Sequence, residues 1–149
     1  VGRGHMKKKL LKVANELGVR ESLFIQSAMS FEDLAQHYRS ADLVVFPSYY
    51  EGQGLIPLEA LASGTPVVTV DQAPLTEMID DTVGGLFDRG DFVGLAKAVC
   101  DELNGHVQRL KKAKAGRKRV LENFTLEGQA ESYEDVFLRS VQKRRWRDS

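Results

Sequence analysis

The sequence predicts an α/β fold, with a Rossmann-like parallel sheet of about four strands flanked by helices. Short apolar runs alternate along the chain with segments whose apolar residues recur at helical spacing, which is typical of a strand–helix–strand architecture. The chain has 149 residues, 42% of them hydrophobic, which is enough to bury one core. We therefore expect a single domain over residues 1–149.

The composition argues against several functional classes. Lys+Arg and Asp+Glu both number 21, so the net charge gives no support for a nucleic-acid partner. The one cysteine, Cys100, cannot form a disulfide within the chain, which fits a reducing, cytoplasmic location, and we expect its thiol to be buried. No apolar run is as long as a membrane span and no signal peptide is visible. The three histidines are far apart in sequence, so no metal site is predicted.

The first part of the chain predicts a helix, a strand and a second helix. Lys7–Leu17 carries its leucines on one helical face and is followed by a glycine, which is a helix stop signal. Leu23–Gln26 is predicted to be a short strand, with Ala28 and Met29 in the loop at its carboxyl end. Ser30 is predicted to cap the next helix, because a serine hydroxyl accepts a hydrogen bond from the first turn.

The central stretch predicts a strand, a loop, a helix and another strand. The two strands are Leu43–Phe46 and Val67–Val70, both short and apolar. Pro57 is tolerated only in the first turn of a helix, so the helix begins near Leu55–Pro57. Ser63-Gly64 ends it before the second strand begins.

The loop Glu51–Gly54 lies where parallel α/β folds bind ligands, beyond the carboxyl end of a strand. Gly52 and Gly54 allow unusual backbone dihedrals and close approach of a ligand. The helix that follows starts with unpaired N–H groups and a partial positive charge, which suit a phosphate or diphosphate.

Glu59 is predicted to reach the same ligand mouth, because a helical side chain leans back toward the N-terminus. A carboxylate would repel a phosphate there, so we expect it to accept hydrogen bonds from sugar hydroxyls. The alternative is purely structural: glycine loops are common in α/β proteins, and Glu59 could merely complement the helix dipole.

The next elements continue the alternation. Leu75–Ile79 is a predicted short helix and Val83–Phe87 a strand, whose glycines allow close packing. Asp91 is predicted to cap the helix that follows. That helix should face the sheet with Leu95, Ala96, Val99 and Leu103, which recur at helical spacing.

The last part of the chain changes character at His106. A strongly basic helix follows, for which a solvated surface helix is favoured; attraction to anionic lipids, and so a peripheral membrane contact, is the alternative. Thr125 is predicted to cap a final helix with an apolar stripe made of Ala130, Tyr133, Val136, Phe137 and Val141.

The run FPSYYEGQGLIPLEALASGTPVV, residues 46–68, resembles the signature of retaining glycosyltransferases of the two-domain GT-B fold, in particular family 4 (group 1). The hallmark of these enzymes is two glutamates separated by seven residues, here Glu51 and Glu59, in a pattern close to P-S-x-x-E-G-x-G-L-x-x-x-E-A-x-A-x-G-x-P-V-V. This chain matches nearly every fixed position of that pattern. Gln53 is a departure, since the family usually has an aromatic residue there.

The resemblance implies roles for individual residues. Glu51 would be the catalytic residue, lying against the donor sugar near its anomeric centre. The backbone of Gly52, Gln53, Gly54 and Leu55 would hold the distal phosphate. Glu59 would bind the ribose of the nucleotide, and the loop with Ala28 and Met29 would lie beside the nucleobase.

The resemblance also implies substrates and partners. The donor would be a nucleotide-diphosphate sugar, with no separate cofactor, and the acceptor a glycan or a lipid-linked molecule. The chain would correspond to part of the C-terminal donor-binding domain, so an N-terminal acceptor-binding domain would be its partner. Residues 125–149 would form the helix and tail that cross back onto that domain.

Two other functions are consistent with parts of the pattern. One is a nucleotide-sugar binding module without catalysis, which turnover of donor would exclude. The other is a dinucleotide-binding oxidoreductase domain; against it, no G-x-G-x-x-G follows a first strand with an acid about 20 residues further on.

Overall fold

The computed structural model describes residues 4–145, and their backbone forms two compact units. The boundary between the units falls within the helix Phe31–Ser40. The first unit ends at Gln36 and the second begins at His37. Each unit is described by itself, and the single domain expected over 1–149 stays a prediction.

The first unit holds helix α1 (Lys7–Glu16), the 3-10 turn η1 (Arg20–Ser22) and the start of α2 (Phe31–Ser40). Gly18 follows α1 with a positive φ of 68°, as expected of a glycine stop. The predicted cap of α2 is confirmed, because the main-chain N–H of Asp33 donates to the Ser30 hydroxyl at 3.1 Å.

The strand predicted at Leu23–Gln26 is wrong, since this segment has no regular secondary structure. A strand needs a neighbouring strand to satisfy its N–H and C=O groups. All three strands of the described residues belong to the second unit, and none of them pairs with this segment. Apolar composition alone does not make a strand, because it does not supply a neighbouring strand.

The second unit is built on a parallel sheet of three strands in the order β1-β2-β3. The strands are β1 (Val44–Phe46), β2 (Val67–Val70) and β3 (Gly84–Phe87), close to the predicted ranges. Val67 is the register partner of both Val44 and Gly84. A Cβ at Gly84 would lie 2.0 Å from the Val67 carbonyl oxygen, so only glycine fits at that point.

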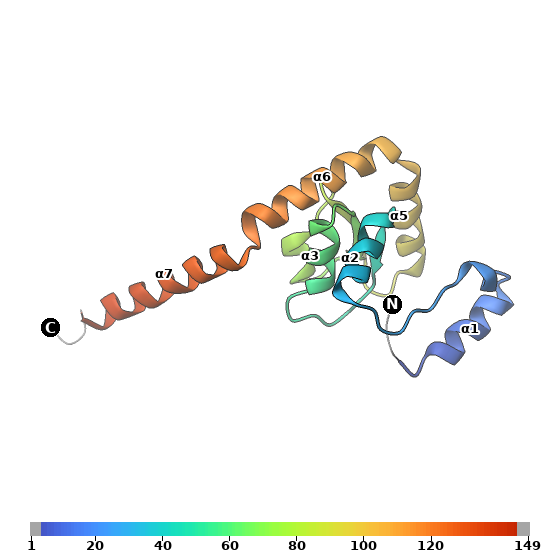
Figure 1. Ribbon diagram of the computed structural model, residues 1–149, viewed down its shortest axis with the longest axis horizontal. Helices are drawn as coiled ribbons and strands as arrows, with labels where there is room; N and C mark the ends of the chain where they lie inside the picture. The colour runs from blue at the N-terminus through green and yellow to red at the C-terminus, as the bar shows by residue number, and fades with distance from the viewer. Residues whose placement is uncertain (1–3, 146–149) are drawn as a thin grey trace. The chain divides into compact units, whose positions relative to one another are not determined.

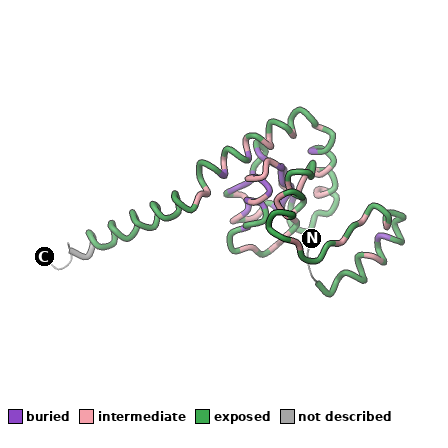
Figure 2. The backbone as a smooth tube through the Cα atoms, viewed as in Figure 1, coloured by how far each residue is buried: buried purple, intermediate pink, exposed green. Residues whose placement is uncertain are grey.

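Helices cover this sheet, as Figure 1 shows. Helix α3 (Leu55–Ala62) packs on β1, β2 and α6, and α5 (Phe92–Asn104) packs on β3. The buried residues lie along the strands and the inner sides of these helices (Figure 2). They include all four residues of β2, which are fully enclosed, so the core sits directly beneath the loop that follows β1.

Helix α5 begins as predicted but faces the sheet with a different set of residues. The Asp91 carboxylate accepts a hydrogen bond from the Gly94 N–H at 2.8 Å, which confirms the predicted cap. Its packed side consists of Leu95, Ala98, Val99 and Glu102. Ala96, Leu103 and the Cys100 thiol, all expected to be buried, are exposed. The apolar residues of α5 lie on more than one side of the helix, so their spacing alone does not show which side packs on the sheet.

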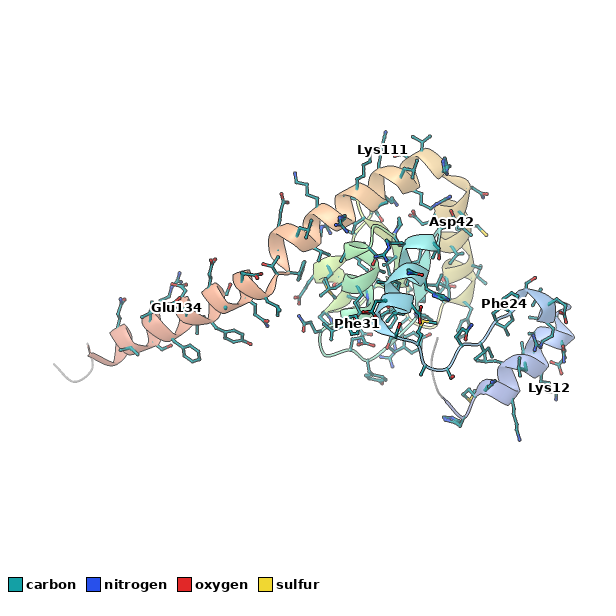
Figure 3. The ribbon with its side chains drawn as sticks, in the orientation of Figure 1. Lys12, Phe24, Phe31, Asp42, Lys111 and Glu134 are labelled. Carbon is teal, nitrogen blue, oxygen red and sulfur yellow. The ribbon has the colours of Figure 1, made fainter. Side chains whose placement is uncertain are left out.

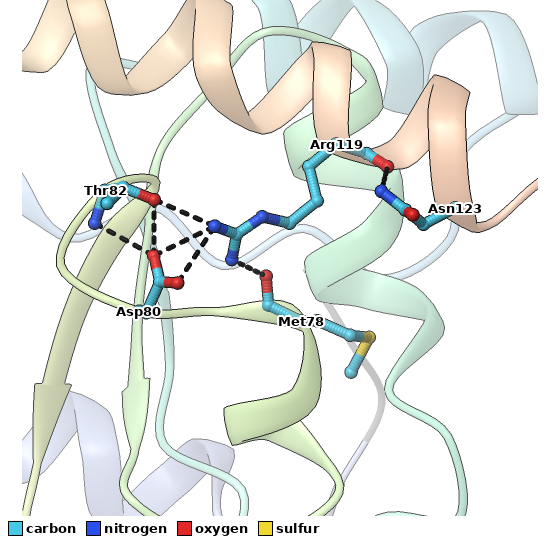
Figure 4. Close-up of polar contacts among 5 residues, drawn as sticks. All are labelled: Met78, Asp80, Thr82, Arg119 and Asn123. Atoms are coloured by element: carbon cyan, nitrogen blue, oxygen red, sulfur yellow. Dashed lines mark hydrogen bonds and ion pairs between the residues drawn. The ribbon is translucent and has the colours of Figure 1, made fainter.

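Helix α6 (His106–Asn123) is bound to the rest of the second unit by its basic side chains, which corrects the expected solvated helix. Figure 4 shows the Arg119 guanidinium donating to both carboxylate oxygens of Asp80, to the Thr82 hydroxyl and to the carbonyl oxygen of Met78, at 2.8 to 3.1 Å. Burial alone would raise the pKa of Asp80, but hydrogen bonds from Thr82 and Arg119, with the arginine charge, outweigh it and lower the pKa.

Three more basic residues of α6 are engaged in the same way. Arg109 pairs with Asp42 at 2.8 Å, Arg117 donates to the Ala62 carbonyl at the end of α3, and Lys112 pairs with the buried Glu102. Lys111, by contrast, points away from the strands (Figure 3). A periodic charge pattern could not distinguish these partnered residues from solvated ones.

The last helix, α7 (Leu126–Arg145), begins at the predicted cap, because the Gly128 N–H donates to the Thr125 hydroxyl at 3.1 Å. Its side chains are exposed along its described length (Figure 2), including the predicted apolar stripe; Tyr133 and Phe137 are 58% and 67% exposed. Within the described part of the chain, no helix is long and apolar enough to span a membrane.

Candidate functional site

The candidate site starts at the loop between β1 and α3. Gly54 is the residue before α3 and has left-handed dihedrals, φ 86° and ψ 56°. A Cβ at Gly54 would lie 2.8 Å from Leu75 Cδ2 and 2.9 Å from Met78 Cε, both buried. Gly54 is therefore needed for the backbone turn and for packing, whereas Gly52 has open space where its Cβ would be.

The start of α3 presents main-chain donors that the protein itself does not use. Pro57, which has no N–H, lies in the first turn, as predicted. The structure records no acceptor among the described residues for the N–H groups of residues 52–56. Residues 52, 53, 55 and 56 are exposed, whereas Gly54 between them is buried. Free N–H groups at a helix start, with the helix dipole behind them, suit an anion.

Glu59 lies just after the first turn of α3, as predicted, and is half-buried. Its Oε2 accepts a hydrogen bond from the Tyr38 hydroxyl of α2 at 3.0 Å. Burial, followed by this hydrogen bond and the charge of Glu59, raises the pKa of Tyr38 to about 12. The sequence gives no local signal for this contact, because Tyr38 and Glu59 are 21 positions apart.

A cleft of about 600 Å³ opens beside α3. Of the predicted site residues it is lined by Gln53, Leu55 and Glu59, together with residues from the end of α6 and the start of α7. Glu51, Gly52 and Gly54 do not line it. Glu51 is half-buried in the same loop. The structure thus brings three of the predicted residues to one cleft, beside the free N–H groups.

The loop is braced by residues that follow the other two strands. From the end of β2, the Gln72 side-chain amide donates to the Tyr49 carbonyl oxygen at 3.1 Å. From the end of β3, Arg89 lies over the rings of Tyr49 and Tyr50, 5.1 and 5.0 Å from their centroids, and donates to the Tyr50 hydroxyl at 2.9 Å. Sequence reasoning missed this brace, because the tyrosine–arginine contacts join residues about 40 positions apart.

The remaining predicted site residues, Ala28 and Met29, belong to the first unit. Ala28 is exposed and Met29 half-buried. Their predicted position beside a nucleobase stays a prediction. Within residues 4–145, no group of three or more His, Cys, Asp or Glu side chains could hold a metal ion.

Known proteins are similar to this chain in sequence and in fold. The D-inositol 3-phosphate glycosyltransferase of Nocardia farcinica is 44% identical over 81 residues, 54% of this chain and 18% of that protein. The enzyme of the same name from Salinispora tropica is 34% identical over 139 residues, 93% of this chain and 29% of that protein. Sucrose-phosphate synthase from Thermosynechococcus elongatus has the same fold, with a TM-score of 0.82 and 28% identity over 94% of this chain and 35% of that one.

The chain therefore spans about a third or less of the length of these relatives. Residues 1–119 match the family described as glycosyl transferases group 1. The sheet and its flanking helices agree with the C-terminal domains of GT-B glycosyltransferases, as the sequence predicted. The chain belongs to the group 1 glycosyltransferase family.

Proposed function

We propose that this chain binds the nucleotide-diphosphate-sugar donor of a glycosyl transfer reaction. The observation that carries the proposal is the set of free main-chain N–H groups at residues 52–56, next to a cleft lined by a glutamate. Membership of the group 1 family supports it. The diphosphate lies on the N–H groups and the helix start, and the Glu59 carboxylate accepts hydrogen bonds from the ribose.

This arrangement meets the main demand of the reaction. When the bond between sugar and diphosphate breaks, negative charge grows on the departing diphosphate and positive charge on the sugar. The N–H groups and the dipole of α3 stabilise the departing diphosphate, and they need no rearrangement because no described residue accepts a hydrogen bond from these N–H groups. Glu51, which follows Tyr50 in the braced loop, orients the sugar hydroxyls and lies near the growing positive charge.

Finer features of the reaction belong to the same proposal. The sugar is transferred with retention of its anomeric configuration, and the acceptor is a glycan or a lipid-linked molecule held by a further domain. On α6, a contact with an anionic membrane would rest on Lys111 and Lys114, because the other Lys and Arg residues of this helix pair within the chain. Nuclear magnetic resonance of the first-formed glycoside would read the configuration.

Calorimetric titration tests the donor site. We would titrate the chain with UDP, GDP and ADP, each with and without an attached hexose, and repeat the series with Glu59→Ala. One diphosphate should bind, and the Glu59→Ala variant should lose about tenfold or more in affinity, since hydrogen bonds to a charged group contribute about 1.5–3 kcal/mol. Glu122→Ala is the matched control, because Glu122 is an exposed glutamate paired with Lys118 on α6. Equal affinity of Glu59→Ala and Glu122→Ala would contradict the ribose assignment.

A second candidate is a donor-binding module that does not itself catalyse transfer. The observation that favours it is that Glu51, the proposed catalytic residue, does not line the cleft that Glu59 lines. Donor hydrolysis, or transfer to an added acceptor, distinguishes the two. Binding without any turnover would support the module.

A further inference from the structure

Tyr38 is held rigidly from two sides. Its ring packs against the buried core of the second unit. Its main-chain carbonyl oxygen accepts a hydrogen bond from the hydroxyl of Thr65, which is itself 1% exposed. Neither contact involves the phenol hydroxyl, so the hydroxyl is presented at a fixed point. That point is 3.0 Å from Glu59 Oε2.

The two carboxylate oxygens of Glu59 have different surroundings. Oε2 accepts the Tyr38 hydrogen bond, whereas no described residue donates a hydrogen bond to Oε1. Glu59 lines the cleft of about 600 Å³. One oxygen is therefore occupied by the protein, and the other remains available to a ligand.

The direction of the hydrogen bond is also fixed. The pKa of Tyr38 is raised to about 12, first by burial and then by Glu59. The phenol therefore keeps its proton at neutral pH and acts as the donor, with the carboxylate as the acceptor.

We propose that Tyr38 is a positioning residue, whose hydroxyl fixes the Glu59 side chain so that Oε1 faces the two vicinal hydroxyls of the ribose. The inference rests on the proposed donor site and adds to it the residue that prepares the ribose contact. A glutamate side chain that is already held loses less conformational entropy when it binds a ligand. Without the phenol, the Glu59 side chain must be ordered by the nucleotide itself.

The test compares two ligands that differ only at the ribose. The nucleoside diphosphate that binds best among UDP, GDP and ADP is titrated against its 2′,3′-dideoxy form, which lacks both hydroxyls. Wild type should bind the ribonucleotide at least about tenfold more tightly, because hydrogen bonds to a charged carboxylate are lost in the dideoxy form. This ratio of affinities measures the ribose contact alone.

Tyr38→Phe should lower the affinity for the ribonucleotide about five- to thirtyfold and leave the dideoxy form within about twofold, because only the charged ribose contact depends on the phenol. In a chain that already carries Glu59→Gln, Tyr38→Phe should not lower the affinity for the ribonucleotide any further. Tyr49→Phe is the matched control: its hydroxyl accepts from the Gly90 N–H at 3.2 Å and does not bond to Glu59. Any loss in Tyr49→Phe should be equal for both nucleotides.

The outcomes separate the two proposals. If Tyr38→Phe weakens both nucleotides equally, or neither, while wild type still prefers the ribonucleotide, Tyr38 is structural and the inference is overturned. If wild type does not prefer the ribonucleotide, the ribose assignment of Glu59 itself fails.

A second measurement does not require Tyr38→Phe to fold. The ionisation of Tyr38 is followed by nuclear magnetic resonance of ζ-carbon-labelled tyrosine in wild type and in Glu59→Gln. The pKa of Tyr38 should fall in the variant, although burial keeps it above the ordinary value. An unchanged pKa would show that the phenol and Glu59 do not interact, and would overturn the inference.

Discussion

Replacement of Gly54 by alanine should destabilise the second unit for two separate reasons. Gly54 has φ 86°, and a residue with a side chain costs about 1–2 kcal/mol more in this left-handed conformation. The new methyl group would also lie 2.8 Å from Leu75 and 2.9 Å from Met78. Overpacking of this kind costs about 1–3 kcal/mol, at the lower end here because both contacts are the far ends of flexible side chains.

These two costs are partly offset in the unfolded state. An alanine restricts the unfolded chain more than a glycine, which stabilises the folded state by about 0.4–1 kcal/mol. The free energy of unfolding should therefore fall by about 1–2.5 kcal/mol, a sizeable part of the usual 5–15 kcal/mol of a domain.

Urea unfolding followed by far-ultraviolet circular dichroism measures this loss. With a slope of about 1–3 kcal/mol per molar urea, the midpoint should fall by about 0.3–2.5 M. Gly52→Ala is the matched control from the same loop: its φ is not positive, and nothing lies within 4 Å of its Cβ position. Gly52→Ala should unfold at the wild-type midpoint or slightly above it. Equal midpoints for the two variants would refute the conformation assigned to Gly54.

Two further predictions concern the attachment of α6. Arg119→Met should lower the free energy of unfolding by about 1–3 kcal/mol, because Asp80 and the Met78 carbonyl lose their hydrogen-bond donor. Lys118 is the exposed residue next to Arg119, and Lys118→Met should change the free energy of unfolding by less than about 0.5 kcal/mol. Since the folded-state pKa of Asp80 is lowered, its stabilising contribution is present above the unfolded-state pKa and disappears as pH falls through the folded-state value; in Arg119→Met this part of the acid dependence should be smaller. Lys112→Met should lower the free energy of unfolding by about 3–5 kcal/mol, because it leaves the buried Glu102 carboxylate without its ion pair. Adding Glu102→Leu to Lys112→Met should restore part of this stability, and thermal unfolding of both variants would measure the change.

The elements that were predicted well are those governed by local rules. The range Val67–Val70 was predicted to the residue, because a buried parallel strand is a continuous apolar run ended by turn residues. The capping residues Ser30, Asp91 and Thr125 were also predicted correctly, since in a cap the side chain accepts from a main-chain N–H only three positions further on.

The features that sequence reasoning missed depend on tertiary structure. The Tyr38–Glu59 hydrogen bond joins residues 21 positions apart, and the Arg119–Asp80 pair joins residues 39 positions apart. No local sequence pattern therefore predicts either contact. The strand expected at Leu23–Gln26 failed for the same reason, because strand formation requires a partner that composition does not reveal. Gln53, Leu55 and Glu59, which line the cleft, could be named from the sequence because they share one short motif, and their roles stay predictions.

The central claim is that the free N–H groups of residues 52–56 receive the diphosphate of a nucleotide sugar. Amide chemical shifts of the nitrogen-15-labelled chain, recorded during titration with UDP, GDP and ADP, test it most directly. The largest shifts should fall on Gly52, Gly54 and Leu55, and inorganic phosphate should move the same amides more weakly. Shifts confined to other segments, such as residues 88–91 between β3 and α5, would contradict this position of the diphosphate.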